Sequence, residues 1–343
     1  MILVTGATGF VGSYLAMQLL ENQVNIRAIY TQEKSIEKTK NIFKHHQKVE
    51  LFKNIEWIQG NITDTTTLSV AFEGIEQVYH CAALVSFNPK DEEKLQKINI
   101  EGTANIVNFC VDFKVKKLCY VSSIAALGDA KEHETLITEE SEWNTALDHS
   151  DYAITKHGAE TEVWRASQEG VEVIIVNPGV IFGYFTGENN AWNNGSGKIF
   201  EKIYKGLPFY TEGKTAIIAV EDVVNAMIML MNATQKNEQY ILVAENVRYQ
   251  NILETIALSI HKKTPSVKIS KNLMVVIRFF DSLFALILFK GAIFSKPITQ
   301  SLFSQDEFSS EKFIAQFKYQ FLEMKPYVTA LGRKFLTDKS TQK

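Results

Sequence analysis

The stretch Ile2-Leu3-Val4-Thr5-Gly6-Ala7-Thr8-Gly9-Phe10-Val11-Gly12 decides the fold of this chain. Its first residues are apolar and β-branched, as in a buried strand, and Val11, Leu15 and Leu19 then recur at helical spacing. Three glycines lie between strand and helix. One allows the tight turn, one lets a pyrophosphate approach the main chain, and one lets the helix pack closely on the strand. Because the helix start also offers free N–H groups, the stretch predicts a phosphate site for a dinucleotide.

Apolar runs alternate with helical patterns through the first half of the chain. The runs typical of buried strands are 26–30, 55–58, 77–80, 117–121 and 171–177. Strands separated by helices pair in parallel through right-handed crossovers. We therefore expect an α/β fold: a Rossmann-type, doubly wound parallel sheet over residues 1–180, to which later segments, about 215–243, return.

The pattern changes after Pro178, and residues 181–343 predict a smaller substrate-binding lobe that is mostly helical after residue 245. Within it, the 17 residues 273–289 are strongly apolar but include Arg278 and Asp281. A membrane-spanning helix needs about 20 predominantly apolar residues, so we expect no transmembrane span. Two alternatives stay open for 272–290: a helix that lines an apolar pocket, or a peripheral contact with a membrane surface.

Composition excludes several classes of function. The 343 residues carry a net charge of -3 and no basic stripe, which argues against a nucleic-acid partner. Cys81, Cys110 and Cys119 are too scattered for a disulfide framework or a zinc site, and adjacent His45 and His46 point apart, so we expect no metal. A strand at the very start leaves no room for a signal peptide, and we expect a cytoplasmic monomer or homodimer.

Tyr152 and Lys156 are four residues apart, so on a helix their side chains share one face. A lysine ammonium about 4 Å from a tyrosinate gains up to roughly 4 kcal/mol at an effective dielectric constant of about 20. We therefore expect Lys156 to lower the pKa of Tyr152 toward the pH where a general acid or base works best. Tyr30–Lys34 and Tyr210–Lys214 share the spacing, but only Tyr152 opens a good helical stretch.

Two further polar residues are candidates for chemistry. Ser123 follows the predicted strand 117–121, where a serine either caps a turn or donates a hydrogen bond to a substrate carbonyl. It precedes Tyr152 by 29 residues, within reach through one crossover, which favours the catalytic role. Asn99 lies in a helical stretch whose apolar residues face the sheet, which predicts a buried amide with a defined hydrogen-bonding role.

Together these residues resemble the extended short-chain dehydrogenase/reductase superfamily, of the NAD-dependent epimerase/dehydratase type. The similarity covers roughly the first 185 residues and rests on Thr5-Gly6-x-x-Gly9-x-x-Gly12, His80-Cys81-Ala82-Ala83, Asn99, Ser123, Tyr152-x-x-x-Lys156 and Asn177-Pro178-Gly179. The resemblance implies that Tyr152 donates or accepts a proton and that Lys156 contacts the nicotinamide ribose. It also implies that Ser123 positions the substrate oxygen and that Asn99 holds part of the proton relay.

Within that superfamily the chain is most similar to the branch of dihydroflavonol reductase, cinnamoyl-CoA reductase and 3β-hydroxysteroid dehydrogenase. The similarity lies in stretches 120–124, 174–183 and 220–223. Nucleotide-sugar epimerases and dehydratases typically have an arginine ahead of the residue equivalent to Asn177, where this chain has isoleucine and valine. Dehydratases also resemble one another in an Asp-Glu pair, and Ile124 and Ala125 stand at those positions.

The resemblance also implies which residues bind the cofactor: Thr5, Gly6, Thr8, Gly9, Phe10, Val11, Gly12, Tyr30, Thr31, Lys34, Asn61, Ile62, Cys81, Ala82, Ala83, Val121, Tyr152, Lys156, Pro178, Gly179 and Val180. The strand 26–30 is followed neither by the acidic residue of NAD enzymes nor by the arginine of NADP enzymes. Asn61 stands where the family usually has aspartate. With no carboxylate there to repel a 2′-phosphate and with Lys34 nearby, NADP is favoured slightly over NAD.

The sequence thus predicts an NAD(P)-dependent oxidoreductase that moves hydride between nicotinamide and a carbonyl or secondary alcohol of an apolar small molecule. The candidate substrate contacts are Val85, Phe182, Tyr184 and Trp192. One alternative is a nucleotide-sugar epimerase or dehydratase with tightly bound NAD. A third is a cofactor-binding sensor without catalysis.

Overall fold

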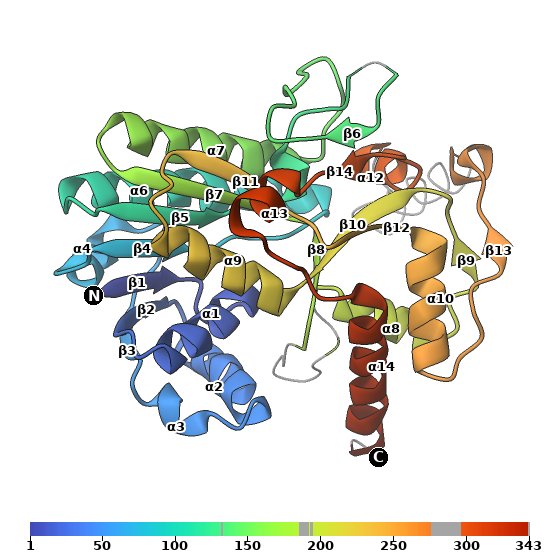
Figure 1. Cartoon of the computed structure of the whole chain (residues 1–343), viewed down its shortest axis with the longest axis horizontal. Helices are drawn as coiled ribbons and strands as arrows, with labels where there is room; N and C mark the ends of the chain where they lie inside the picture. Colours follow the sequence, from blue (N-terminus) through green and yellow to red (C-terminus); the bar gives the residue numbers. More distant parts are fainter. Residues whose placement is uncertain (132, 185–191, 193–194, 276–295, 342–343) are drawn as a thin grey trace.

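A seven-stranded, wholly parallel sheet forms the centre of the molecule (Figure 1). The computed structural model describes residues 1–131, 133–184, 192, 195–275 and 296–341. The strand order is β11-β7-β5-β4-β1-β2-β3. The strands are β1 (Ile2–Thr5), β2 (Ile26–Tyr30), β3 (Glu56–Gln59), β4 (Gln77–His80), β5 (Lys117–Val121), β7 (Glu172–Pro178) and β11 (Glu238–Leu242).

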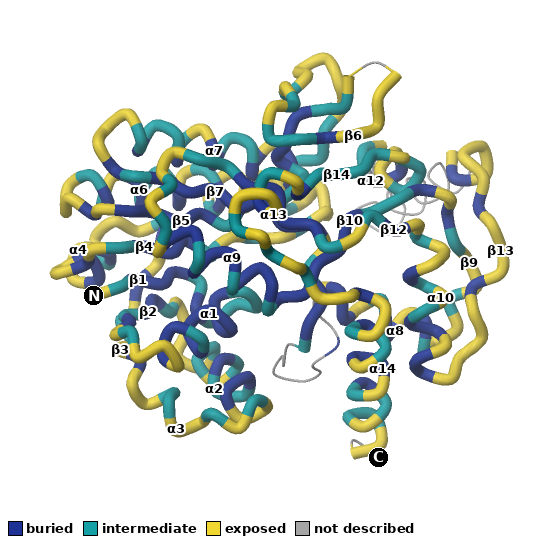
Figure 2. The backbone as a smooth tube through the Cα atoms, in the orientation of Figure 1, coloured by how far each residue is buried: buried dark blue, intermediate teal, exposed yellow. Residues whose placement is uncertain are grey.

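Helices cover both faces of this sheet, and each face has its own apolar core. On one face lie α1 (Phe10–Glu21), α2 (Ile36–His45), α3 (Val49–Phe52) and α9 (Val220–Asn232). On the other lie α4 (Ser69–Phe72), α6 (Gly102–Asp112) and α7 (Asp151–Gln168), with α5 (Glu92–Leu95) preceding α6. Figure 2 shows the central strands between them as mostly buried, whereas the edge strand β3 is partly exposed. The predicted Rossmann-type fold is confirmed.

The second half of the chain contributes to both parts of the molecule. From the segments expected to return to the main sheet, β11 pairs in parallel with β7, with Glu238 opposite Ile174. The other strand from that region, β10 (Lys214–Ala219), instead lies in a three-stranded sheet between β12 (Glu245–Arg248) and β8 (Val180–Phe182). The helix between the two, α9, covers the main sheet.

The C-terminal lobe is built on this small sheet. Its core is formed by α8 (Gly197–Tyr204), α10 (Tyr249–Ser259) and α14 (Met324–Thr341). Short elements complete it: β6 (Leu136–Ile137) paired with β14 (Glu307–Phe308), β9 (Phe209–Tyr210) paired with β13 (Val267–Lys268), and the helices α12 (Lys296–Ser301) and α13 (Glu311–Phe317). The lobe is mostly helical after residue 245, but β12, β13 and β14 were not predicted, because runs of two to four residues carry no readable alternation.

A buried lysine joins the sheet to α9. Lys117 begins β5 and is 4% exposed, and its Nζ donates hydrogen bonds to the carbonyl oxygens of Leu230 at 2.8 Å and Ala233 at 2.9 Å. Leu230 lies in the last turn of α9 and Ala233 is its C-cap, a region where backbone acceptors are left without helical partners. The ammonium supplies the missing donors and its charge complements the negative end of the helix dipole. Lys117 thus fixes the C-terminal end of α9 against the start of the central strand β5.

We expect Lys117→Met to lower the free energy of unfolding by about 2 kcal/mol, because carbonyl acceptors buried at the end of α9 would lose a charged donor. Urea unfolding followed by circular dichroism measures this change. The matched control is the neighbouring Lys116→Met, since Lys116 is exposed and pairs only with the carboxylate of Glu76 in the described structure. Equal midpoints for the two variants would show that Lys117 does not stabilise α9.

Candidate functional site

The glycine turn connects β1 to α1. At Gly6 and Gly12 the neighbouring backbone leaves no room for a side chain. Gly6 has a φ of +69°, and a Cβ added there would lie 2.6 Å from the backbone nitrogen of Ala82. A Cβ on Gly12 would lie 2.2 Å from the carbonyl oxygen of Gly6. Gly9 is the N-cap of α1, and no side chain caps this helix start in the described structure. The free N–H groups and the dipole of α1 therefore fit a dinucleotide pyrophosphate.

A buried histidine holds the end of β4 beneath this turn. His80 contacts the Thr5 hydroxyl through Nδ1 at 2.6 Å and the Thr103 hydroxyl through Nε2 at 3.0 Å. Burial lowers the pKa of His80 to about 3, so the ring stays neutral and links the two hydroxyl groups by hydrogen bonds. The Thr5 hydroxyl also accepts the N–H of Ala82. This arrangement fixes residues 81–83, predicted to border the cofactor, next to Gly6.

The predicted adenosine end is an open hollow past the carboxyl ends of β2 and β3. Its lining consists of Thr31, Gln59, Gly60, Asn61 and Thr67. The Asn61 side-chain oxygen accepts hydrogen bonds from the N–H and the hydroxyl of Thr63, which fixes the loop after β3. Two predicted residues, Thr31 and Asn61, thus meet in one hollow.

Other predicted cofactor residues lie around this hollow and beside the glycine turn. Tyr30 ends β2, with its ring packed edge-on against Trp57. Lys34 is exposed in the short helix that follows, whereas Ile62 is buried and packs against Gly102 of α6. Thr8 belongs to the turn, and Phe10 and Val11 open α1.

Tyr152 is buried, and its phenol interacts with the Ser123 side chain. It is the second residue of α7, whose start is capped by the Ser150 hydroxyl, which accepts the N–H of Ala153. Ser123 follows the end of β5. Burial raises the pKa of Tyr152, and the hydrogen bond with Ser123 opposes this rise in part. The phenol is therefore protonated at neutral pH.

Lys156 is directed toward β5. Its Nζ donates to the hydroxyl of Tyr120 at 2.6 Å and to the carbonyl oxygen of Val121 at 2.8 Å. Burial lowers the pKa of Lys156 to about 7, against the attraction of the Glu160 carboxylate. We expected Lys156 to lower the pKa of Tyr152, but in this structure that pKa is raised. The reason is that burial penalises the charged forms of both side chains, a cost that helix spacing alone does not reveal.

Asn99 connects the loop after β4 to the start of α7. It lies in a π-helical turn, Gln96–Glu101, an irregularity that often marks functional sites. Its side chain accepts the N–H of Leu84 at 2.8 Å and donates to the Leu84 carbonyl at 3.0 Å and to the Thr155 hydroxyl at 3.1 Å. Thr155 in turn donates to the carbonyl of Tyr152. Asn99 therefore holds the backbone that carries the Tyr152 phenol.

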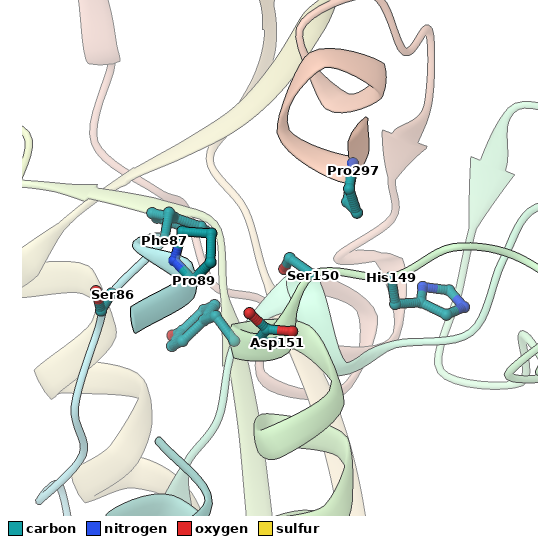
Figure 3. A pocket seen from close by; sticks show the side chains of 8 residues that line it. Ser86, Phe87, Pro89, His149, Ser150, Asp151 and Pro297 are labelled. Carbon is teal, nitrogen blue, oxygen red and sulfur yellow. The ribbon is translucent and has the colours of Figure 1, made fainter. Parts of the chain in front are cut away.

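A small pocket opens beside Tyr152 (Figure 3). It is lined by Ser86, Phe87, Pro89, His149, Ser150, Asp151, Tyr152 and Pro297. The ring of Phe87 meets the ring of Tyr152 edge-on, with centroids 5.5 Å apart. Phe87 is 54% exposed, so an apolar ring faces solvent next to the phenol, and Val85 two residues earlier in the same loop is 64% exposed. An apolar substrate would cover them.

The other predicted substrate residues lie deeper in the lobe. Phe182 and Trp192 are buried in its core, and the Trp192 indole donates to Asp338 of α14. The Tyr184 ring packs on His45 of α2 with centroids 4.0 Å apart. These contacts give all three side chains packing partners within the protein. Most of the stretch 272–290 and of the loop 187–195 lies outside the described residues.

Residues 178–180 connect the two sheets. Pro178 ends β7 and Val180 begins β8. A Cβ on Gly179 between them would lie 2.6 Å from the carbonyl oxygen of Ala216, so glycine lets the main chain pass close to β10. In the main sheet, Val121 of β5 pairs with Val176 of β7, and the Asn177 amide donates to the carbonyl of Ser123. The predicted nicotinamide end thus lies at the carboxyl ends of β5 and β7.

Several residues of this site were not predicted from the sequence. They are Tyr120 and Glu160 beside Lys156, Thr155 beside Asn99, and Phe87 in the pocket. Glu160 carried a readable signal, because it lies one helical turn after Lys156. Phe87 carried none, since a single aromatic residue in a polar loop is usually unremarkable.

No helix in the described ranges has the length and apolar character that crossing a bilayer requires. Nor do those ranges hold a cluster of three or more histidine, cysteine, aspartate or glutamate side chains that could bind a metal ion.

Comparison with known proteins identifies relatives in the family that the sequence motifs predict. The model of the NAD dependent epimerase/dehydratase family matches residues 2–243. A putative dihydroflavonol 4-reductase of Synechocystis is 28% identical over 260 residues, 73% of this chain and 69% of that protein. A UDP-glucose 4-epimerase of Vibrio cholerae is 25% identical over 277 residues, 77% of this chain and 76% of that protein.

The fold also matches solved structures. A short-chain dehydrogenase/reductase superfamily protein from Agrobacterium tumefaciens, solved with bound NAD, superposes with a TM-score of 0.71 over the whole of both chains at 15% identity. The resemblance predicted from the glycine turn and the Tyr-x-x-x-Lys spacing is confirmed.

We expect Gly6→Ala to weaken binding of reduced dinucleotide at least about 100-fold, because the methyl group would displace the backbone at Ala82. Fluorescence titration with NADPH and NADH measures this affinity. Gly74→Ala is the matched control: Gly74 has a φ of +71°, close to that of Gly6, but no atom lies within 4 Å of an added Cβ. It should lose about 1–2 kcal/mol of stability from backbone strain yet bind dinucleotide normally. Equal affinities would exclude crowding as the reason for glycine at residue 6.

Proposed function

The chain belongs to the NAD dependent epimerase/dehydratase family, and from this premise we propose that it is an NAD(P)-dependent oxidoreductase of the extended short-chain type. It transfers hydride between nicotinamide and a carbonyl or secondary alcohol of an apolar substrate. One observation carries the proposal: Tyr152, whose phenol interacts with Ser123, lines a pocket in which the apolar ring of Phe87 is exposed.

The catalytic residues act on one oxygen atom. The bound nicotinamide supplies or accepts the hydride. Ser123 donates a hydrogen bond to the substrate oxygen, and Tyr152 gives that oxygen a proton in reduction or takes one in oxidation. Because the pKa of Tyr152 is raised, the phenol is ready as an acid at neutral pH. Alcohol oxidation needs the tyrosinate, so its rate should increase with pH.

The pocket favours an apolar substrate over a nucleotide sugar. Its described lining contains no lysine or arginine to pair with a diphosphate, whereas Phe87 offers an aromatic face. The similarity to a putative dihydroflavonol 4-reductase supports a substrate that carries rings. Aromatic and alicyclic rings would stack on Phe87 and cover Val85.

NADP remains our preferred cofactor. The residues that line the adenosine hollow include no carboxylate that would repel a 2′-phosphate, and Lys34 follows Thr31 at its edge. A cytoplasmic monomer or homodimer is the form in which we propose that the enzyme works. Contact of the apolar stretch 272–290 with a membrane surface stays an open proposal.

A second candidate function is epimerisation of a nucleotide sugar, favoured by the similarity to a UDP-glucose 4-epimerase. Such an enzyme regenerates its cofactor in each cycle and retains it. The purified protein should therefore carry stoichiometric NAD and bind UDP if it is an epimerase, and neither if it is the reductase that we propose. Mass spectrometry of the denatured protein and calorimetry with UDP decide between the two.

We expect Tyr152→Phe to lower kcat/KM at least about 1,000-fold and to leave cofactor affinity within about threefold, because the variant loses the transferable proton alone. The assay is NADPH oxidation with a panel of ring-bearing ketones and aldehydes. Tyr210→Phe is the control, since Tyr210 shares the four-residue spacing to a lysine but lies in β9. Full activity of Tyr152→Phe would refute the mechanism. A wild-type protein that binds NADPH but reduces no carbonyl would indicate the sensor.

A further inference from the structure

A buried carboxylate lies behind the catalytic residues. Glu160 is 4% exposed and lies one turn after Lys156 on α7. Its Oε1 accepts a hydrogen bond from the Asn177 amide at 2.6 Å, and its Oε2 accepts one from the Gln239 amide at 3.2 Å. Gln239 also donates to the Asn177 side-chain oxygen at 2.9 Å. Three side chains from α7, β7 and β11 thus form a closed network.

The network reaches the catalytic serine through one amide group. The Asn177 nitrogen that donates to Glu160 also donates to the backbone carbonyl of Ser123 at 2.9 Å. An amide nitrogen has two hydrogens, and both are used here. Because Glu160 fixes the plane of this amide, it also fixes the carbonyl of Ser123 and the start of the turn that presents the serine hydroxyl.

Glu160 also acts on Lys156 through charge. Burial raises the pKa of the carboxyl to about 7, against hydrogen bonds and the charge of Lys156, which lower it. In return the carboxylate raises the pKa of Lys156. The titratable groups around this pair are Tyr120 on β5, His80 on β4 and Cys81 after β4. Burial keeps all three neutral near pH 7, so in the described structure Glu160 is the carboxylate that offsets the ammonium.

We propose that Glu160 is a positioning residue for the hydride-transfer site, which holds Ser123 in place through the Asn177 amide. The inference rests on the proposed function and adds a residue to it. Loss of the acceptor at Glu160 should therefore release the Asn177 amide and the Ser123 carbonyl that it fixes, and with them the serine hydroxyl that meets the substrate oxygen.

The test uses Glu160→Gln, which removes the charge but keeps an acceptor for Asn177. Its kcat for alcohol oxidation should stay within about threefold of wild type. Glu160→Ala also removes the acceptor and should lower kcat at least about tenfold, while the KM for the cofactor stays within about threefold. Glu162→Gln is the control, since Glu162 lies on the same helix and pairs with Arg165. It should behave as wild type.

A second readout does not need turnover. The amide protons of Ala125 and Ala126 are bonded to the hydroxyl and carbonyl oxygens of Ser123, so their hydrogen exchange reports on the position of this turn. Exchange measured by NMR should be at least about tenfold faster in Glu160→Ala than in wild type and in Glu160→Gln. A protein without turnover would refute the proposed function and leave this readout to decide the role of Glu160. Exchange rates that agree within about twofold in all three proteins would overturn the inference.

Discussion

The rest of the structure depends on the close approach of the first turn to the strands beside it. No Cβ fits at Gly6 or Gly12, because the backbone of Ala82 and of the turn itself occupies that space. The helix α1 can therefore start directly at the end of β1 and direct its free N–H groups across the carboxyl edge of the sheet. A dinucleotide bound there must extend along this edge, which sets where its reactive end can reach.

The reactive end is defined by a single helix. Tyr152, Lys156 and Glu160 follow one another at intervals of four residues on α7, so they form one stripe that faces β5 and β7. The stripe passes from the pocket at Tyr152 to the buried network at Glu160. Asn99 and Ser123 contact it from the π-helical turn and from the end of β5. Regular helical geometry thus supplies the spacing, and irregular elements supply the partners.

The fold could be predicted from the sequence, and the candidate catalytic residues could be proposed from it, because each depends on local spacing. Glycine intervals, apolar runs and the Tyr-x-x-x-Lys interval are all visible within about ten residues. Long-range partners were not visible: Gln239 reaches Asn177 across 62 residues, and Phe87 meets Tyr152 from a loop without a pattern. The raised pKa of Tyr152 was also missed, because burial is a property of the assembled site.

Burial of this stripe has an energetic cost that the chain offsets internally. A lysine and a glutamate removed from water lose several kcal/mol of hydration each, and their mutual attraction repays the loss only when every remaining polar atom is paired. Here the partners come from β5, β7 and β11, and Gln239 of β11 lies 79 residues beyond Glu160 in the chain. The site can therefore assemble only after the last strand has joined the sheet. The geometry of the site therefore forms only when the second half of the chain folds.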